Sequence, residues 1–169
     1  MFSIKKKFVP ANSLLEKYSA MNGAYTDCYT TVIEKRIAFP EFIFAFYTTP
    51  LFKLERLILK FTVSKPSTDL DARRLADGST DKFAAWTAEN RKENEILMCD
   101  FLSRTRSWLM LNANGTQTQL YFGSAVVPKT GAASLDFGFR ALLEFHKIYS
   151  VLLLWSAKLR IASQIKKGL

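Results

Sequence analysis

Residues 104–127 read RTRSWLMLNANGTQTQLYFGSAVV, two segments of alternating side chains separated by Asn114-Gly115. An Asn-Gly pair favours a tight type I′ turn, because both central residues of that turn need a positive φ. The sequence therefore predicts a β-hairpin with strands at about 104–111 and 117–127 and with Asn114-Gly115 as its two-residue turn.

The register of this hairpin decides which side chains share a face, because side chains alternate across a strand. In the predicted register Leu109 pairs with Leu120, and Trp108 pairs with Tyr121. One face is apolar with a polar end, as in a core or a pocket wall: Thr105, Ser107, Leu109, Leu111, Leu120, Phe122, Ser124 and Val126. The opposite face is charged and amphipathic, as in a sheet face exposed to solvent: Arg104, Arg106, Trp108, Met110, Gln119 and Tyr121.

The other segments complete a pattern typical of a single α+β domain. An apolar run is interrupted at Thr48-Thr49-Pro50, which favours two short helices because proline is tolerated at the first position of a helix. Apolar residues that recur every three or four positions predict one long helix at the end of the chain. The expected elements are a short helix between Ser13 and Gly23, a strand at 25–36, helices at 40–47 and 50–62, a surface loop with at most one helical turn at 64–80, strands at 82–89 and 94–100, and a helix from Phe137 to about Lys166.

Length and composition limit the class of protein. The 169 residues fit one domain, 1–169, and a hydrophobic fraction of 49% excludes an intrinsically disordered chain. Cys28 and Cys99 give neither a disulfide framework nor a metal-ligand spacing, and no cofactor motif is present. The chain opens without the apolar segment of a signal peptide, so a cytoplasmic location is expected.

The net charge of +9 is partly concentrated at the two ends of the chain. The basic segments 1–10 and 160–169 are expected to be solvated and flexible. Weak contact with an anionic membrane surface is an alternative use of this charge. Nucleic acid is not expected as a partner, because no recognition motif accompanies the charge.

Two residues are candidates for acid–base chemistry, and each has a structural alternative. His146 is the only histidine, and it serves either as a base or as a hydrogen-bonded core residue of the last helix. Asp100 falls at the polar end of the apolar face, where it either faces a pocket or caps the turn after its strand. No nucleophile motif accompanies them, so the sequence predicts no catalytic site.

The order of the expected elements resembles that of the START-like helix-grip superfamily over about residues 25–165. In both, a strand is followed by two short helices, antiparallel strands and a long last helix. More narrowly, the chain is similar to a small bacterial domain family of that type. The matching phrases are Ser13-Leu14-Leu15 ahead of Tyr25-Thr26-Asp27, the helical block from Pro40 to Phe61, and Phe145-His146.

The resemblance implies a curved antiparallel sheet wrapped around the last helix, with a cavity between them. Members of the superfamily bind lipids, sterols or polyketides, and a few are cyclases. This chain has five convincing strands, fewer than the superfamily usually has. A smaller or more open cavity is therefore expected.

Binding of an apolar small molecule or lipid-like ligand between the sheet and the last helix is the function that these observations favour. The expected ligand-binding residues are Thr105, Ser107, Leu109, Leu120, Phe122, Ser124, His146 and Tyr149. One alternative is a cyclase- or isomerase-like enzyme that uses His146 and Asp100. The other is an interaction or homodimerisation module accessory to a separate enzyme, with an interface formed by Arg104, Arg106, Trp108 and Tyr121.

Overall fold

A computed structural model of the chain describes residues 4–54, 56, 66–127 and 137–167, with the side chains of the last helix described from Lys147 onward. Across these residues, antiparallel strands form one seven-stranded sheet in the order β1-β2-β7-β6-β5-β4-β3. The strands are β1 (Lys5–Lys6), β2 (Tyr25–Ile33), β3 (Lys82–Phe83), β4 (Trp86–Lys92), β5 (Glu95–Asp100), β6 (Thr105–Asn114) and β7 (Gln117–Val126). The helices are α1 (Glu16–Ser19), α2 (Phe39–Tyr47), α4 (Asp69–Asp77) and α5 (Phe137–Lys166), and residues 50–54 and 56 are helical as well.

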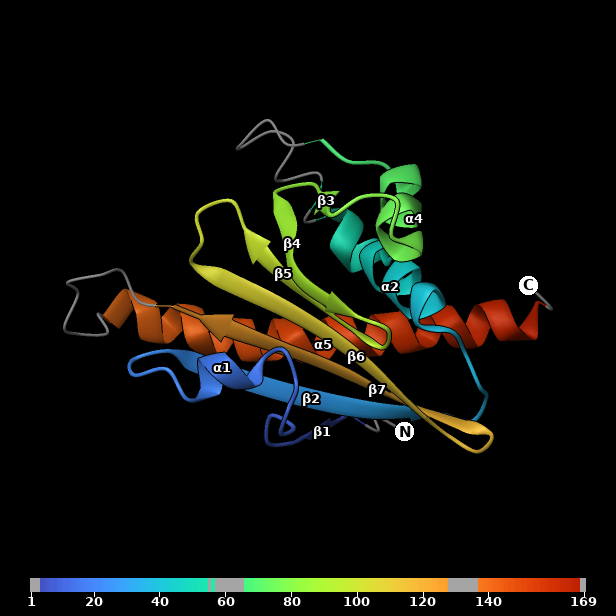
Figure 1. The fold of residues 1–169 in the computed structure, drawn as a ribbon, viewed down its shortest axis with the longest axis horizontal. Helices are drawn as coiled ribbons and strands as arrows, with labels where there is room; N and C mark the ends of the chain where they lie inside the picture. Colours follow the sequence, from blue (N-terminus) through green and yellow to red (C-terminus); the bar gives the residue numbers. More distant parts are fainter. Residues whose placement is uncertain (1–3, 55, 57–65, 128–136, 168–169) are drawn as a thin grey trace.

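The long helix α5 crosses one face of the sheet, and α2 and α4 lie against the same side at one end (Figure 1). The main core lies between these layers, because the apolar face of the central strands meets apolar side chains of the helices there. Phe46 of α2, for example, has its ring centroid 4.9 Å from that of Phe122 on β7. The expected α+β class is confirmed.

The turn between β6 and β7 differs from the predicted one. Asn114 pairs with Gln117, so the two-residue turn is Gly115-Thr116. Gly115 has a φ of +60° and Asn114 does not have a positive φ, an arrangement that matches a type II′ turn with glycine at its first central position. The predicted Asn114-Gly115 turn is therefore wrong by one residue.

This correction moves each cross-strand pair by two residues. Leu109 faces Phe122 instead of Leu120, and Trp108 faces Gly123 instead of Tyr121. Because side chains alternate with a period of two, a shift of two residues leaves every side chain on its predicted face. The composition of both hairpin faces is confirmed even though the pairs are not.

We expect Gly115→Ala to destabilise the domain by about 1–2 kcal/mol, because an L-residue with a positive φ is strained. Asn114→Ala, one residue earlier, is expected to change the free energy of unfolding by no more than about 0.5 kcal/mol, as at most exposed sites. Urea midpoints of the two variants measure this difference. Equal losses of stability in both variants would indicate that Asn114-Gly115 is the turn after all.

Several other elements also differ from expectation. The strand expected at 82–89 is divided into β3 and β4 around Ala84, which has a φ of +52°. The expected surface loop at 64–80 contains the nine-residue helix α4, which is longer than the single turn expected. Lys5–Lys6 pairs with β2, so this part of the basic N-terminal segment belongs to the sheet. The short strands β1 and β3 account for the difference between five expected and seven observed strands.

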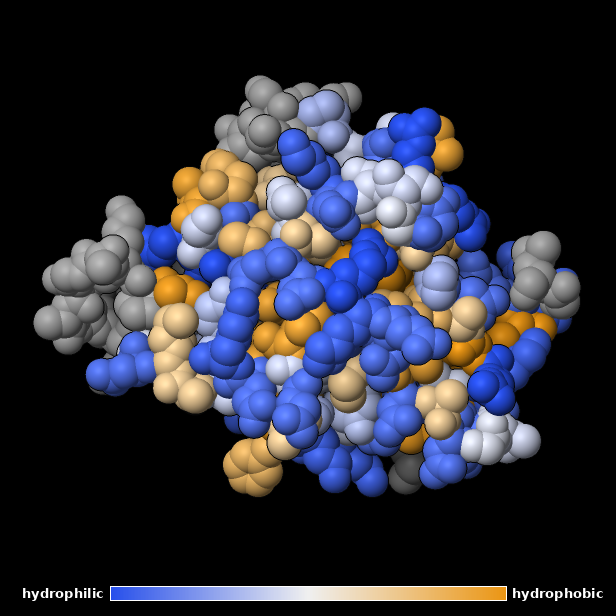
Figure 2. Space-filling model, in the orientation of Figure 1, coloured by the Kyte–Doolittle hydropathy of each residue, from blue (hydrophilic) through white to orange (hydrophobic). Residues whose placement is uncertain are grey.

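A second, smaller core lies on the other face of the sheet. The segment that contains α1 crosses this outer face and packs Leu14, Leu15 and Tyr18 against Trp108. Gly123 makes the close approach possible, because a Cβ atom at this position would lie 2.6 Å from Leu15 Cδ2 and 2.8 Å from a backbone oxygen of β2. Hydrophilic side chains cover much of this side of the molecule (Figure 2).

Candidate functional site

The helix-covered face of the sheet carries a row of three buried polar side chains across its central strands. Asp27 on β2 pairs with Ser124 on β7, which pairs in turn with Ser107 on β6. Their exposed fractions are 2%, 1% and 8%. The apolar Met98 on β5 pairs with Ser107 and is the neighbour of the polar row on that side.

The next row along the same strands is apolar or aromatic and is also buried. Tyr29, Phe122, Leu109 and Ile96 pair with one another from β2 to β5. Leu120 and Leu111 follow one row further on. The face is therefore an apolar wall with the polar row near one end, and Tyr25, Val126 and Thr105 form the row beyond it.

Hydrogen bonds define the geometry of the polar row at Asp27. Its Oδ1 accepts a hydrogen bond of 3.0 Å from the amide of Ser124 and one of 2.5 Å from the hydroxyl of the same residue. Because the Ser124 proton is directed at Asp27, the Ser124 oxygen can meet a ligand only as an acceptor. Burial of a carboxylate is costly unless polar neighbours compensate, which is what this row provides.

The structure brings most of the residues predicted to bind a ligand to this one wall. Ser107, Leu109, Leu120, Phe122 and Ser124 are buried on it. Thr105 is half-buried at its outer end, and Tyr149 of α5 packs against the core that the wall faces. His146 belongs to α5, but its side chain lies outside the described residues.

Asp100 caps the turn between β5 and β6. Its Oδ1 accepts hydrogen bonds from the backbone amides of Arg104 at 2.7 Å and Thr105 at 3.0 Å. These bonds correspond to the structural alternative for Asp100. An acid–base role with His146 gains no support from the described contacts of Asp100.

The sequence predicted that the outer face of the hairpin is exposed to solvent. The structure shows instead that the centre of this face is buried. Trp108 is fully buried, and its Nε1 donates a 2.8 Å hydrogen bond to the buried Glu95. The N-terminal segment covers it, so Trp108 offers no surface to a partner. Tyr121 is half-buried beside the same cluster, and Arg104 is half-buried at the strand end.

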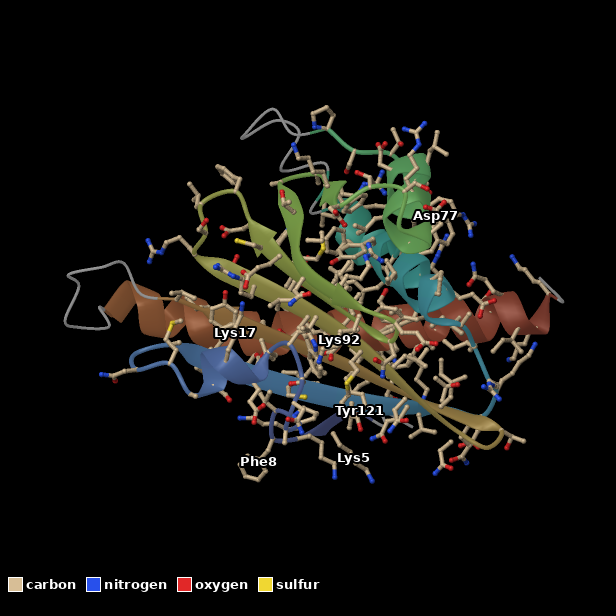
Figure 3. All side chains as sticks on the ribbon, in the orientation of Figure 1. Lys5, Phe8, Lys17, Asp77, Lys92 and Tyr121 are labelled. Atoms are coloured by element: carbon tan, nitrogen blue, oxygen red, sulfur yellow. The ribbon has the colours of Figure 1, made fainter. Side chains whose placement is uncertain are left out.

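Arg106, also predicted at an interface, is held within the chain. Its Nε lies 2.5 Å from Glu89 Oε2 and 2.9 Å from the hydroxyl of Tyr18. Burial opposes the ionisation of Glu89, but hydrogen bonds from Lys17, Tyr18 and Arg106 lower the pKa of its carboxyl. The network fastens α1 to β4 and β6, and Lys17 projects from α1 on this side of the molecule (Figure 3).

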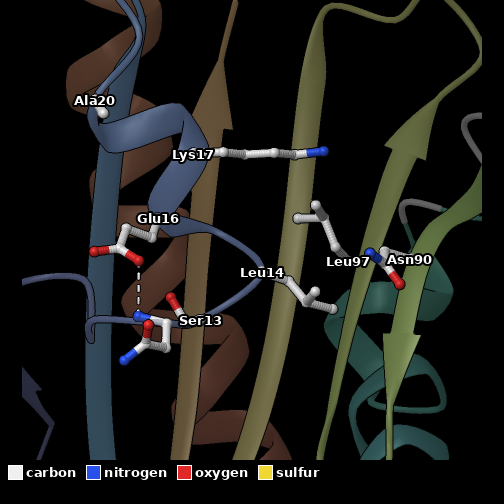
Figure 4. A pocket seen from close by; sticks show the side chains of 8 residues that line it. Ser13, Leu14, Glu16, Lys17, Ala20, Asn90 and Leu97 are labelled. Carbon is white, nitrogen blue, oxygen red and sulfur yellow. Dashed lines mark hydrogen bonds between the residues drawn. The ribbon is translucent and has the colours of Figure 1, made fainter.

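An open pocket of about 440 Å³ lies between the N-terminal segment and the outer face of the sheet (Figure 4). Leu14 and Leu97 contribute its apolar lining, and Glu16 and Lys17 are among its charged residues. Within it, Glu16 accepts a 2.7 Å hydrogen bond from the amide of Asn12. This pocket is separated by the sheet from the polar row, so the two are distinct features.

Asp27 is the site residue that the sequence interpretation missed. It stands in a strand of aromatic and β-branched residues, where a single carboxylate is the one signal that could have identified it. Its place beside Ser124 follows only from the pairing of β2 with β7, strands that are distant in the sequence.

Neither a metal centre nor a membrane helix is found in the part of the chain that the structure describes. There, no three or more histidine, cysteine, aspartate or glutamate side chains are grouped to hold a metal ion. Likewise, none of its helices combines the length and the hydrophobicity needed to cross a bilayer. Comparisons of the chain with protein-family models, curated proteins and solved structures found no match.

Proposed function

We propose that the chain is a START-like helix-grip domain that binds a small, mainly apolar molecule between the sheet and α5. The ligand carries a hydroxyl or a similar hydrogen-bonding group, which faces Asp27, Ser124 and Ser107. Its apolar body lies along the wall that contains Leu109 and Phe122.

The observation that carries this proposal is the buried polar row near one end of an apolar wall. Binding sites for small molecules are lined mainly by apolar side chains with a few placed polar groups. The row has this composition, since Asp27, Ser124 and Ser107 are buried next to Tyr29, Phe122 and Leu109. The long helix laid across a seven-stranded antiparallel sheet supports the helix-grip assignment.

A fluorescence titration with prodan, a neutral naphthalene dye, tests the proposal. We expect saturable binding that 1-octanol competes away. Ser107→Leu is expected to weaken dye binding about tenfold or more. The variant loses the hydrogen bond of the Ser107 hydroxyl, and the larger leucine side chain occupies space that the ligand needs; each change disfavours binding by about a kcal/mol or more.

Met110→Leu is the matched control, since Met110 lies on β6 but belongs to the outer face. It should leave dye affinity unchanged. Ser124→Ala removes one hydroxyl without adding volume and keeps the test valid if Ser107→Leu does not fold. Equal affinities in all of these proteins, or no saturable binding, would refute the proposed function.

A further inference from the structure

A second groove lies near the C-terminal end of α5 and does not involve the polar row. Its volume is about 280 Å³, and its apolar lining consists of Ile37, Phe44, Ile161 and Ile165. Lys35, Arg36 and Arg73 are its cationic residues. The groove thus combines an apolar surface with a positively charged rim.

The cations of this groove form no close ion pairs in the described part of the chain, although Arg73 interacts at longer range with the carboxylate of Asp77, which lies one turn further along α4. Arg73 stacks with its guanidinium carbon 3.8 Å from the ring centroid of Phe44, and that of Arg160 lies 5.9 Å from the same centroid. In the described part of the chain, no ion pair within 4.0 Å joins Lys35, Arg36, Arg73 or Arg160 to an acidic group.

The one acidic residue that lines the groove is already engaged in local structure. Glu41 Oε2 accepts a 2.7 Å hydrogen bond from the amide of Ala38 at the start of α2. Three cationic residues against this single carboxylate leave an excess of positive charge. Guanidinium groups bind carboxylates and phosphates through charge-assisted hydrogen bonds, so an anion would relieve this excess.

The groove and the polar row lie near different parts of the same helix. Lys147 of α5 lies 5.8 Å from the ring centroid of Tyr25, whereas Lys158 donates a 3.1 Å hydrogen bond to Thr31. The helix therefore runs along β2, and Ile161 lies beyond Lys158, away from Asp27. An occupant of the groove does not depend on the function proposed above.

We propose that this groove binds an anionic amphiphile, a short apolar chain that ends in a carboxylate or phosphate group. The chain packs on Phe44 and Ile161, and the anionic group meets Arg73 together with Lys35 or Arg36. Neither part of the ligand alone satisfies both the apolar lining and the charged rim.

Calorimetric titration of the full chain with octanoate at low ionic strength tests this proposal, because salt screens exposed charges. Arg73→Gln is expected to weaken octanoate binding about tenfold, the effect of one lost charge-assisted hydrogen bond. Arg74→Gln is the matched control: Arg74 is the next residue of α4, but it lies 3.8 Å from Asp71 and does not line the groove. Both residues are exposed, so neither change should impair folding.

Three further titrations complete the test. We expect acetate and inorganic phosphate each to bind more weakly than octanoate, since each lacks the apolar chain. We expect 1-octanol, which lacks the charge, not to displace octanoate from the groove. Octanoate affinity that is the same in the Arg73→Gln and Arg74→Gln variants would overturn the proposal. Displacement of octanoate by an equal concentration of 1-octanol would do so as well, and equal binding of acetate or phosphate would reduce the groove to an anion site without an apolar component.

Discussion

A chain that ends at Tyr149 is expected to lose cooperative unfolding altogether. This truncation removes Leu153, Leu154 and Ile161, which are buried in the core between α5 and the sheet. Burial of each such side chain contributes about 1.5–3 kcal/mol. Their combined loss is comparable to the total stability of about 5–15 kcal/mol that domains of this size have.

Urea denaturation followed by tryptophan fluorescence measures this effect. The matched control is a chain that ends at Ile165, which removes only the exposed Lys166 and Lys167 from the described residues. We expect it to retain a sigmoidal transition at nearly the wild-type midpoint. A sigmoidal transition of the chain that ends at Tyr149 would show that α5 is peripheral, and the packing described here would then be incorrect.

Glu95→Ala is expected to destabilise the domain by about 2–5 kcal/mol, since each buried donor left without an acceptor costs about 1–3 kcal/mol. Glu95 Oε2 accepts hydrogen bonds of 2.8 Å from the amide of Leu14 and from Trp108 Nε1. Lys92 Nζ lies 2.8 Å from the other carboxylate oxygen. Glu95 therefore joins the N-terminal segment to the sheet through one buried carboxylate.

Thermal unfolding of Glu95→Ala and of Glu93→Ala, an exposed glutamate in the adjacent turn, provides the comparison. Glu93→Ala should be nearly neutral. Trp108→Phe removes the indole donor of the same hydrogen bond. The double variant with Glu95→Ala should therefore lose less free energy of unfolding than the two single variants together, with a coupling energy of about 0.5–3 kcal/mol. Additive losses would mean that the bond between Trp108 and Glu95 contributes little.

The faces of the central hairpin could be predicted from sequence because they depend only on alternation. Ser107, Leu109 and Phe122 were placed on one face from their spacing, and a two-residue shift in register did not move them. The turn itself was mispredicted because Asn114-Gly115 satisfies a type I′ turn locally. The strands instead place Gly115 at the first central position, which only the full ladder of pairs decides.

Helix α4 was detectable from local signals that the turn-rich composition around it obscured. The Thr68 hydroxyl accepts a hydrogen bond from the amide of Asp71, and the Asp71 carboxylate accepts one from the amide of Thr68. Hydrogen bonds from the Thr68 hydroxyl and amide lower the pKa of the Asp71 carboxyl. Gly78, with a φ of +82°, ends the helix. A threonine and an acidic residue three positions apart, followed by a glycine, are the usual marks of a helix.

The covering of the outer face could not be predicted from sequence, because it depends on contacts between distant segments. Leu14 and Glu95 are joined by a hydrogen bond across 81 positions of the chain. The same covering explains the burial of Cys28, which belongs to the outer core and is 1% exposed. Burial raises the pKa of its thiol to about 12. Asp27 next to it was missed for a similar reason, since its partner Ser124 is 97 positions away.

NMR of the chain labelled with 13C-methyl methionine, titrated with 1-octanol, tests the proposed binding site most directly. Met98 is fully buried and pairs with Ser107 at the end of the polar row, whereas Met110 belongs to the outer face and Met21 is exposed. A ligand between the sheet and α5 should shift the Met98 methyl signal saturably and leave those of Met21 and Met110 in place. An unmoved Met98 signal, or equal shifts of all three, would contradict a binding site on the helix-covered face.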